Sequence, residues 1–73
     1  MEDFFIYRPS LARKISAQGF KLEMITNIYD SDRPAWKCKL SRPAASVIAE
    51  YFLSIGKDVP RNVKDVLNQV TSN

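Results

Sequence analysis

The side chains that most often carry catalysis are scarce in this chain of 73 residues. It has no histidine and only one cysteine, Cys38. Histidine is the usual general base near neutral pH, and one thiol without histidines cannot complete a tetrahedral zinc site. The chain also has only two glycines, Gly19 and Gly56, too few for a glycine-rich phosphate-binding loop. We therefore expect a protein that is not an enzyme and that takes no metal or cofactor.

The remaining candidates for chemistry have structural explanations. Cys38 lies between Trp36 and Leu40 on the apolar side of a predicted strand. A thiol buried there has a raised pKa and is inert, so we assign it to the core. Asp30 and Asp32 flank a predicted turn, but the segment lacks the glycine and the final glutamate of an EF-hand loop. We assign both carboxylates to the turn.

The clearest pattern in the chain is the stretch "RPAWKCKLSRPAA", residues 33–45. Lys37 and Lys39 alternate there with apolar residues, so a strand turns both lysines to one face. The preceding stretch "FKLEMITNIY" adds further residues to that face: Lys21, Glu23, Ile25, Asn27 and Tyr29. A solvated outer face is the simplest explanation of the lysine row, a protein-binding face is the second, and a nucleic-acid-binding face is the third.

The N-terminal stretch "EDFFIYR" is apolar on both faces of a predicted strand. Phe4 and Ile6 fall on one side, and Phe5 and Tyr7 fall on the other. One side can enter the core, while the other must be covered by something else. A central position in the sheet, packing by the last helix, or contact with a partner protein would each cover it.

Prolines and glycines divide the chain into six predicted elements in the order β-α-β-β-α-α. The expected strands are residues 3–8, 20–29 and 33–40. Three helices are expected, one capped by Ser10 and ended by Gly19, one capped by Ser41 or Arg42 and ended by Gly56, and one from Asp58 to Val70. The expected fold class is α+β, with a small three-stranded antiparallel sheet covered on one face by helices. The length fits a single compact domain, residues 1–73, and the crossover between the first two strands leaves room for the third between them.

The turn between the second and third strands sets their expected register. A turn centred near Asp32 predicts inner pairs Ile28–Trp36, Thr26–Cys38 and Met24–Leu40, and outer pairs Asn27–Lys37 and Ile25–Lys39. The helices are expected to cover the inner face with apolar residues at helical spacing. The clearest set is Ala44, Val47, Ile48, Tyr51, Phe52 and Ile55.

The net charge of +3 comes from the first part of the chain. Residues 1–42 carry eight Lys or Arg against five Asp or Glu, whereas residues 43–73 carry three of each. This surplus falls short of the dense basic runs of strong nucleic-acid binders. The sequence shows no charged-then-apolar leader and no apolar run long enough for a membrane span, and the lone cysteine fits a reducing compartment. We expect a cytoplasmic protein without a membrane partner.

In size, single cysteine, basic surplus and βαββαα layout, the chain resembles small phage-encoded transcription regulators that bind bacterial RNA polymerase. The resemblance implies a phage protein acting in the host cytoplasm without catalysis, as a monomer when free. It also implies inhibition of initiation by displacement of the sigma factor, together with antitermination. The expected partner is therefore a host protein complex, RNA polymerase above all.

The residues expected to bind this partner follow from charge position and exposed aromatics. Phe5 and Tyr7 are the expected apolar anchors. Their expected charged rim is Arg8, Arg13 and Lys14, and Lys37 and Lys39 form a second candidate patch. A basic patch of this kind would also steer encounter with an acidic complex.

Two other functions stay open at this point. The chain could be a small nucleic-acid-binding module that uses the basic hairpin face, or an inhibitor of another host machine such as a defence nuclease. The stretch "FFIYRPSLARKISAQGFKL" is also similar to uncharacterised mobile-element domains that open with a strand, a short helix, Gly-Phe and a second strand. That second resemblance supports the fold and carries no function.

Overall fold

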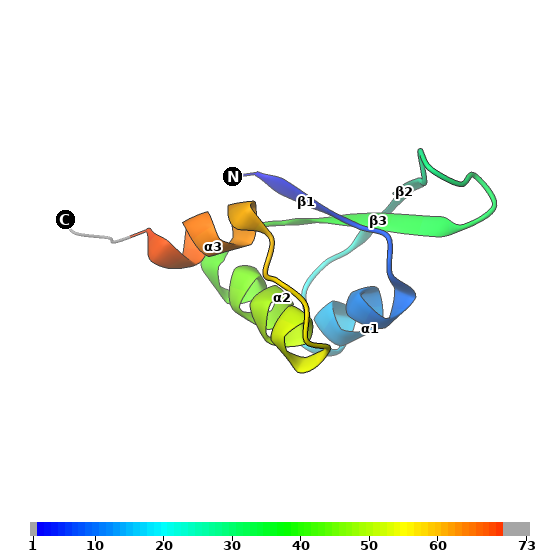
Figure 1. Ribbon diagram of the computed structural model, residues 1–73. Helices are drawn as coiled ribbons and strands as arrows, with labels where there is room; N and C mark the ends of the chain where they lie inside the picture. The colour runs from blue at the N-terminus through cyan, green and yellow to red at the C-terminus, as the bar shows by residue number, and fades with distance from the viewer. Residues whose placement is uncertain (1, 70–73) are drawn as a thin grey trace.

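The computed structural model describes residues 2–69, which form a three-stranded sheet and three helices (Figure 1). The elements in chain order are β1 (Asp3–Ile6), α1 (Pro9–Ala17), β2 (Glu23–Thr26), β3 (Pro34–Lys39), α2 (Arg42–Ser54) and α3 (Arg61–Asn68). The α+β class and the order of elements predicted from the sequence are both confirmed.

The third strand along the chain lies in the middle of the sheet. The strand order is β1-β3-β2, and β3 runs antiparallel to both neighbours. On one side Phe4 lies opposite Cys38 and Ile6 opposite Trp36. The crossover from β1 through α1 to β2 therefore leaves the central position to β3. This agrees with the expectation from the sequence that the crossover leaves room for a strand there. Because β1 is an edge strand, a central position does not explain its apolar outer face.

α1 and α2 lie on the same side of the sheet, and α3 packs on α2 at the end of the sheet where β1 begins (Figure 1). The side chains of alternate strand residues, such as Ile6 and Cys38, point into this layer and are buried. The helices supply the other half of the core: Leu11, Ala12, Ile15, Ala45, Ile48, Ala49, Tyr51 and Val63. Burial of these apolar side chains is the main favourable term that holds the helices on the sheet. Ile55, expected on this face, is instead 40% exposed because the helix has already ended at Ser54.

The helix ends follow local rules, with one exception. Ser41 caps α2, because its Oγ accepts a hydrogen bond from the backbone N–H of Ala44. Gly19 and Gly56 take positive φ after α1 and α2, where other residues would be strained. The prediction that Ser10 caps α1 is wrong, since α1 begins at Pro9. The Ser10 hydroxyl lies 2.6 Å from the Tyr51 hydroxyl and ties α1 to α2.

The second strand is shorter than predicted, and its register differs. Met24 lies opposite Trp36, not Leu40, and Thr26 lies opposite Pro34. The segment after Thr26 leaves the sheet, so Ile28 is 76% exposed and does not face Trp36. Asn27 is buried and does not face Lys37 on the surface. The physical cause is the turn built by Asn27, described below.

The last helix begins later than predicted, at Arg61, with Val63 buried. Its C-terminal end is held by α2, because the Arg42 guanidinium donates hydrogen bonds to the carbonyls of Leu67 and Gln69. A cation at the C-terminal end of a helix also interacts favourably with the helix dipole. Val70, the last predicted inward residue, lies outside the described residues.

Candidate binding surface

Within residues 2–69, no helix covers the face of the sheet opposite the helical layer (Figure 1). We call this face the outer sheet face. By strand alternation and register it is formed by Asp3, Phe5, Tyr7, Glu23, Ile25, Ala35, Lys37 and Lys39, with Tyr29 folded against it. Phe5 is 51% exposed, although β1 pairs fully with β3. Within the described part of the chain, nothing covers the Phe5 and Tyr7 side of β1, which is expected from the sequence to be covered.

A small aromatic cluster occupies one end of the outer sheet face. The rings of Tyr7 and Tyr29 meet edge to face, with centroids 5.1 Å apart. Ala35 lies opposite Ile25 and is fully buried, although it does not belong to the main core. Extending the β1–β3 register by one residue places Tyr7 on the other side of Ala35. The cluster therefore forms a second, small apolar patch around Ala35, with the rings of Tyr7 and Tyr29 packed edge to face beside it.

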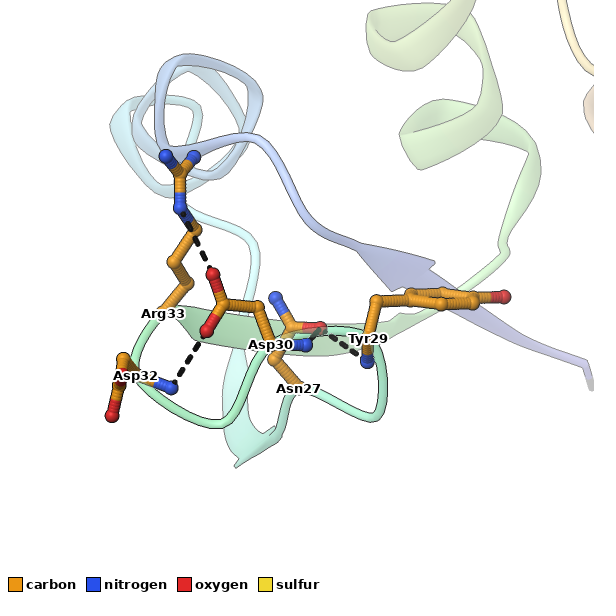
Figure 2. Close-up of polar contacts among 5 residues, drawn as sticks. All are labelled: Asn27, Tyr29, Asp30, Asp32 and Arg33. Atoms are coloured by element: carbon orange, nitrogen blue, oxygen red, sulfur yellow. Dashed lines mark hydrogen bonds and ion pairs between the residues drawn. The ribbon is translucent and has the colours of Figure 1, made fainter.

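The loop at residues 27–33 positions Tyr29 (Figure 2). The Oδ1 atom of Asn27 accepts hydrogen bonds from the backbone N–H groups of Tyr29 and Asp30, at 2.9 and 3.1 Å. Asp30 in turn accepts from the N–H of Asp32 and forms an ion pair with Arg33. Figure 2 shows the Tyr29 ring pointing away from the Asp30–Arg33 side of the loop. The carboxylate of Asp30 serves the turn, as its sequence context indicated.

The lysine row of the outer sheet face is paired with acidic side chains. Lys39 Nζ lies 3.1 Å from a carboxylate oxygen of Asp3. Lys37 Nζ lies 3.8 Å from Glu23, which is directly opposite on β2, and 3.9 Å from Asp3, which is diagonal to it on β1. Two lysines and two carboxylates balance in charge. The predicted basic row is therefore a mixed-charge row in the folded protein, because the neighbouring strands contribute the acids.

The predicted binding residues fall into two groups on opposite layers. Phe5 and Tyr7 share the outer sheet face with the row of Lys37 and Lys39 just described. The other three residues lie on the helical side: Arg8 at the N-terminus of α1, and Arg13 and Lys14 within it. Arg13 borders a groove beside Trp36, and Lys14 forms an ion pair with Glu50 at 3.1 Å. The expected rim of Arg13 and Lys14 around Phe5 is thus not assembled on one surface.

Cys38 is the one thiol of the chain and is 5% exposed on the helical side of β3. Burial raises the pKa of the Cys38 thiol, and the charge of Asp3 raises it further. Both effects favour the unreactive neutral thiol. In residues 2–69 no cluster of three or more His, Cys, Asp or Glu side chains could hold a metal ion. Within the described residues, the structure therefore shows neither a reactive thiol nor a metal-binding cluster.

Sequence reasoning missed how many aromatic side chains the outer sheet face carries. Alternation along the predicted hairpin places Tyr29 on this face, but it does not determine which strand lies beside β1. Because β1 pairs with β3, Phe5 and Tyr7 join Tyr29 on the same face. The alternation of Phe4, Phe5, Ile6 and Tyr7 already separated the two faces, and only the neighbour of β1 was lacking.

No family model, curated protein or solved structure that was compared with this chain matches it. None of its helices within residues 2–69 has the length and apolar character needed to cross a membrane.

Proposed function

We propose that this protein acts without catalysis, by docking its outer sheet face on a host protein complex. One observation carries the proposal: Phe5, Tyr7 and Tyr29 gather on a sheet face that the described residues leave uncovered, beside charges that are already paired. Aromatic side chains are enriched at the centres of protein interfaces, whereas charged side chains are depleted there and belong to the rim, so we place the aromatic rings at the centre of the contact and the paired charges at its edge.

The size of the molecule fits this mode of action. A standard interface takes about 800 Å² from each partner. The accessible surface of the chain is 5177 Å², so one such contact would use about a sixth of it. Phe5 and Tyr29 are exposed before binding, at 51% and 78%, and their burial would supply much of the apolar area. The two hydrogen bonds accepted by Asn27 restrain the backbone that carries Tyr29, which limits the entropy lost when that ring is immobilised.

The partner we propose is bacterial RNA polymerase in the host cytoplasm, which is the partner that the resemblance to phage transcription regulators implies. A protein without catalytic groups changes an equilibrium only by binding one state more tightly than the other. Shifting polymerase from almost fully sigma-bound to almost fully sigma-free needs about 5.5 kcal/mol of differential binding. A few buried aromatic anchors can supply that energy. Antitermination would follow from continued binding to the elongating enzyme.

The test is binding to purified bacterial RNA polymerase, measured by interferometry with core enzyme and holoenzyme on separate sensors. We expect the unmodified chain to bind core enzyme more tightly than holoenzyme. The variant with Phe5→Ala and Tyr29→Ala should bind at least about tenfold more weakly, since it removes two anchors. The matched control is Leu53→Ala, because Leu53 is equally apolar and 69% exposed, but lies on α2 in the helical layer.

Two results would contradict this proposal. The first is a chain that binds neither form of polymerase. The second is equal binding by the unmodified chain and the double variant, because then the outer sheet face is not the contact surface. A circular-dichroism spectrum shared by all variants excludes unfolding as the cause of a loss.

A second candidate function is binding of single-stranded nucleic acid on the same face. The observation that favours it is the coexistence of three aromatic rings with Lys21, Lys37 and Lys39, a combination that suits base stacking with phosphate contacts. The ion pairs of Asp3 and Glu23 oppose it, because phosphates would have to displace or tolerate both carboxylates. Three phosphate contacts predict a salt slope of about −2 for a single strand. An oligonucleotide titration over rising salt that gives this slope would favour the nucleic-acid function over the protein-binding one.

A further inference from the structure

A strip of the helical side of the sheet, beneath β2, is left uncovered by α1. That helix packs on β1, β3 and α2, whereas β2 makes its main contacts with β3. Met24 lies opposite Trp36 and so faces the helical side, yet it is 70% exposed. Trp36 itself is only half-buried. The largest side chain of β3 therefore has one flank open.

This open flank forms a groove with one wall from α1. The groove is lined by Pro9, Ala12, Arg13, Ser16, Leu22 and Trp36. Its volume is about 270 Å³, just below the range of about 300–1,000 Å³ common for small-molecule pockets. It suits the insertion of one large side chain better than a complete small ligand.

The charge of the groove selects what can enter it. Arg13 is the only charged residue in the lining, and it is exposed. Among residues 2–69, Arg13 takes part in no ion pair, whereas its neighbour Lys14 is held by Glu50. α1 contains no acidic residue that could neutralise it. A segment that carries a carboxylate next to an apolar side chain would therefore find a partner for each group: Arg13 for the carboxylate and Trp36 for the apolar side chain.

We propose that this groove binds a short acidic segment of a partner protein, which inserts one apolar side chain against Trp36 and pairs a carboxylate with Arg13. Tryptophan and arginine are the residues that most often dominate binding energy at protein interfaces. A single unpaired cation is too little for nucleic acid, which needs several phosphate contacts. The groove and the outer sheet face lie on opposite sides of β3, so this site is separate from the proposed docking face.

A second copy of the chain is a weaker occupant. Its loop 27–33 offers exposed Ile28 and two aspartates, but Arg33 already pairs with Asp30. Insertion of that loop into the groove of the next copy would also be a head-to-tail contact, which gives open chains unless the rotation closes a ring.

The test uses Trp36, the only tryptophan of the chain, as the reporter. Random peptides displayed on phage are selected against the full chain, and the most enriched peptides are synthesised. We expect them to carry Asp or Glu beside a large apolar residue, and to change the Trp36 emission in a saturable way. Arg13→Glu should weaken their binding at least about tenfold, because it replaces the attraction with repulsion. The matched control is Arg61→Glu, an exposed cation on α3, which should leave binding unchanged.

Several outcomes would overturn the proposal. They are the absence of enriched peptides, enrichment without acidic residues, binding that survives Arg13→Glu, and binding that leaves Trp36 emission unchanged. Loss of peptide binding in the Phe5→Ala, Tyr29→Ala variant would assign the peptides to the outer sheet face and overturn it too. A Trp36 emission that changes with the concentration of the chain alone would identify a second copy as the occupant. A failed polymerase titration would leave this result unaffected, because the two sites are tested by different variants.

Discussion

At the scale of single residues, Asn27 does most to shape the outer sheet face. Its side chain is 6% exposed, and its Oδ1 satisfies two backbone N–H groups that have left the sheet. Those bonds end β2 at Thr26 and carry Tyr29 back towards Tyr7. One amide therefore determines both the length of a strand and the place of an aromatic ring.

Replacement of Asn27 tests this role. Asn27→Ala should lower the free energy of unfolding by about 1–3 kcal/mol, since two N–H groups lose their acceptor. Asn27→Asp keeps an oxygen acceptor at the same place and should lose less. Urea denaturation followed by circular dichroism measures both. Equal stability of Asn27→Ala and the unmodified chain would show that the turn does not depend on this side chain.

The buried thiol of Cys38 makes a prediction about pH. Folding raises the pKa of Cys38 above its ordinary value of 9.0, so the folded state holds the proton more tightly than the unfolded state. Its contribution to stability is therefore complete below pH 9.0 and is lost as the pH rises through the folded pKa. Urea denaturation of the unmodified chain and of Cys38→Ala across this range measures the difference. A stability difference between the two that stays constant with pH would contradict the burial of the thiol.

At the scale of elements, the sequence predicts helices and strand faces better than it predicts pairing. Proline, glycine and the helical or strand periodicity of apolar residues are local signals. They are enough to predict β1, α1, α2 and the inner face of β3. The register of β2 depends on hydrogen bonds accepted by the Asn27 side chain, and the periodicity of apolar residues does not predict such bonds. The predicted register nevertheless keeps Met24 on the same face as Trp36, because any even shift preserves the alternation.

The cap of α2 is the most local of these signals and gives an element-scale prediction. Ser41→Ala should lower the free energy of unfolding by about 1 kcal/mol, because the N–H of Ala44 loses its acceptor. Ser46→Ala makes the same chemical change at an exposed position within α2, where alanine is the better helix former. Thermal denaturation compares them. If Ser46→Ala destabilised the fold as much as Ser41→Ala did, the assignment of the cap would fail.

The sequence predicts only part of the candidate surface, because it indicates the two faces of each strand but not which strands are neighbours. Alternation places Phe5 and Tyr7 on one face of β1, and Lys37 and Lys39 on one face of β3. That these two faces coincide depends on which strands are neighbours and on their register, which alternation within a single strand does not determine. The pairing of Lys39 with Asp3 has the same origin.

At the scale of the whole molecule, the distribution of charge on the folded surface differs from its distribution along the sequence. The basic surplus lies in residues 1–42, yet the central row of the outer sheet face is balanced because lysines and acids meet across strands. Arg13, which takes part in no ion pair among the residues described, lies instead on the helical side. The molecule therefore offers an aromatic face with paired charges on one side of β3 and a small cationic groove on the other.

The most direct test of the central claim is amide hydrogen exchange of the chain, alone and with purified bacterial RNA polymerase. We expect slower exchange in β1 and in the loop 27–33 when polymerase is present, with little change along the exposed side of α2 around Leu53. Slower exchange confined to α2 and α3, with β1 and the loop unchanged, would contradict the claim that the outer sheet face is the docking surface.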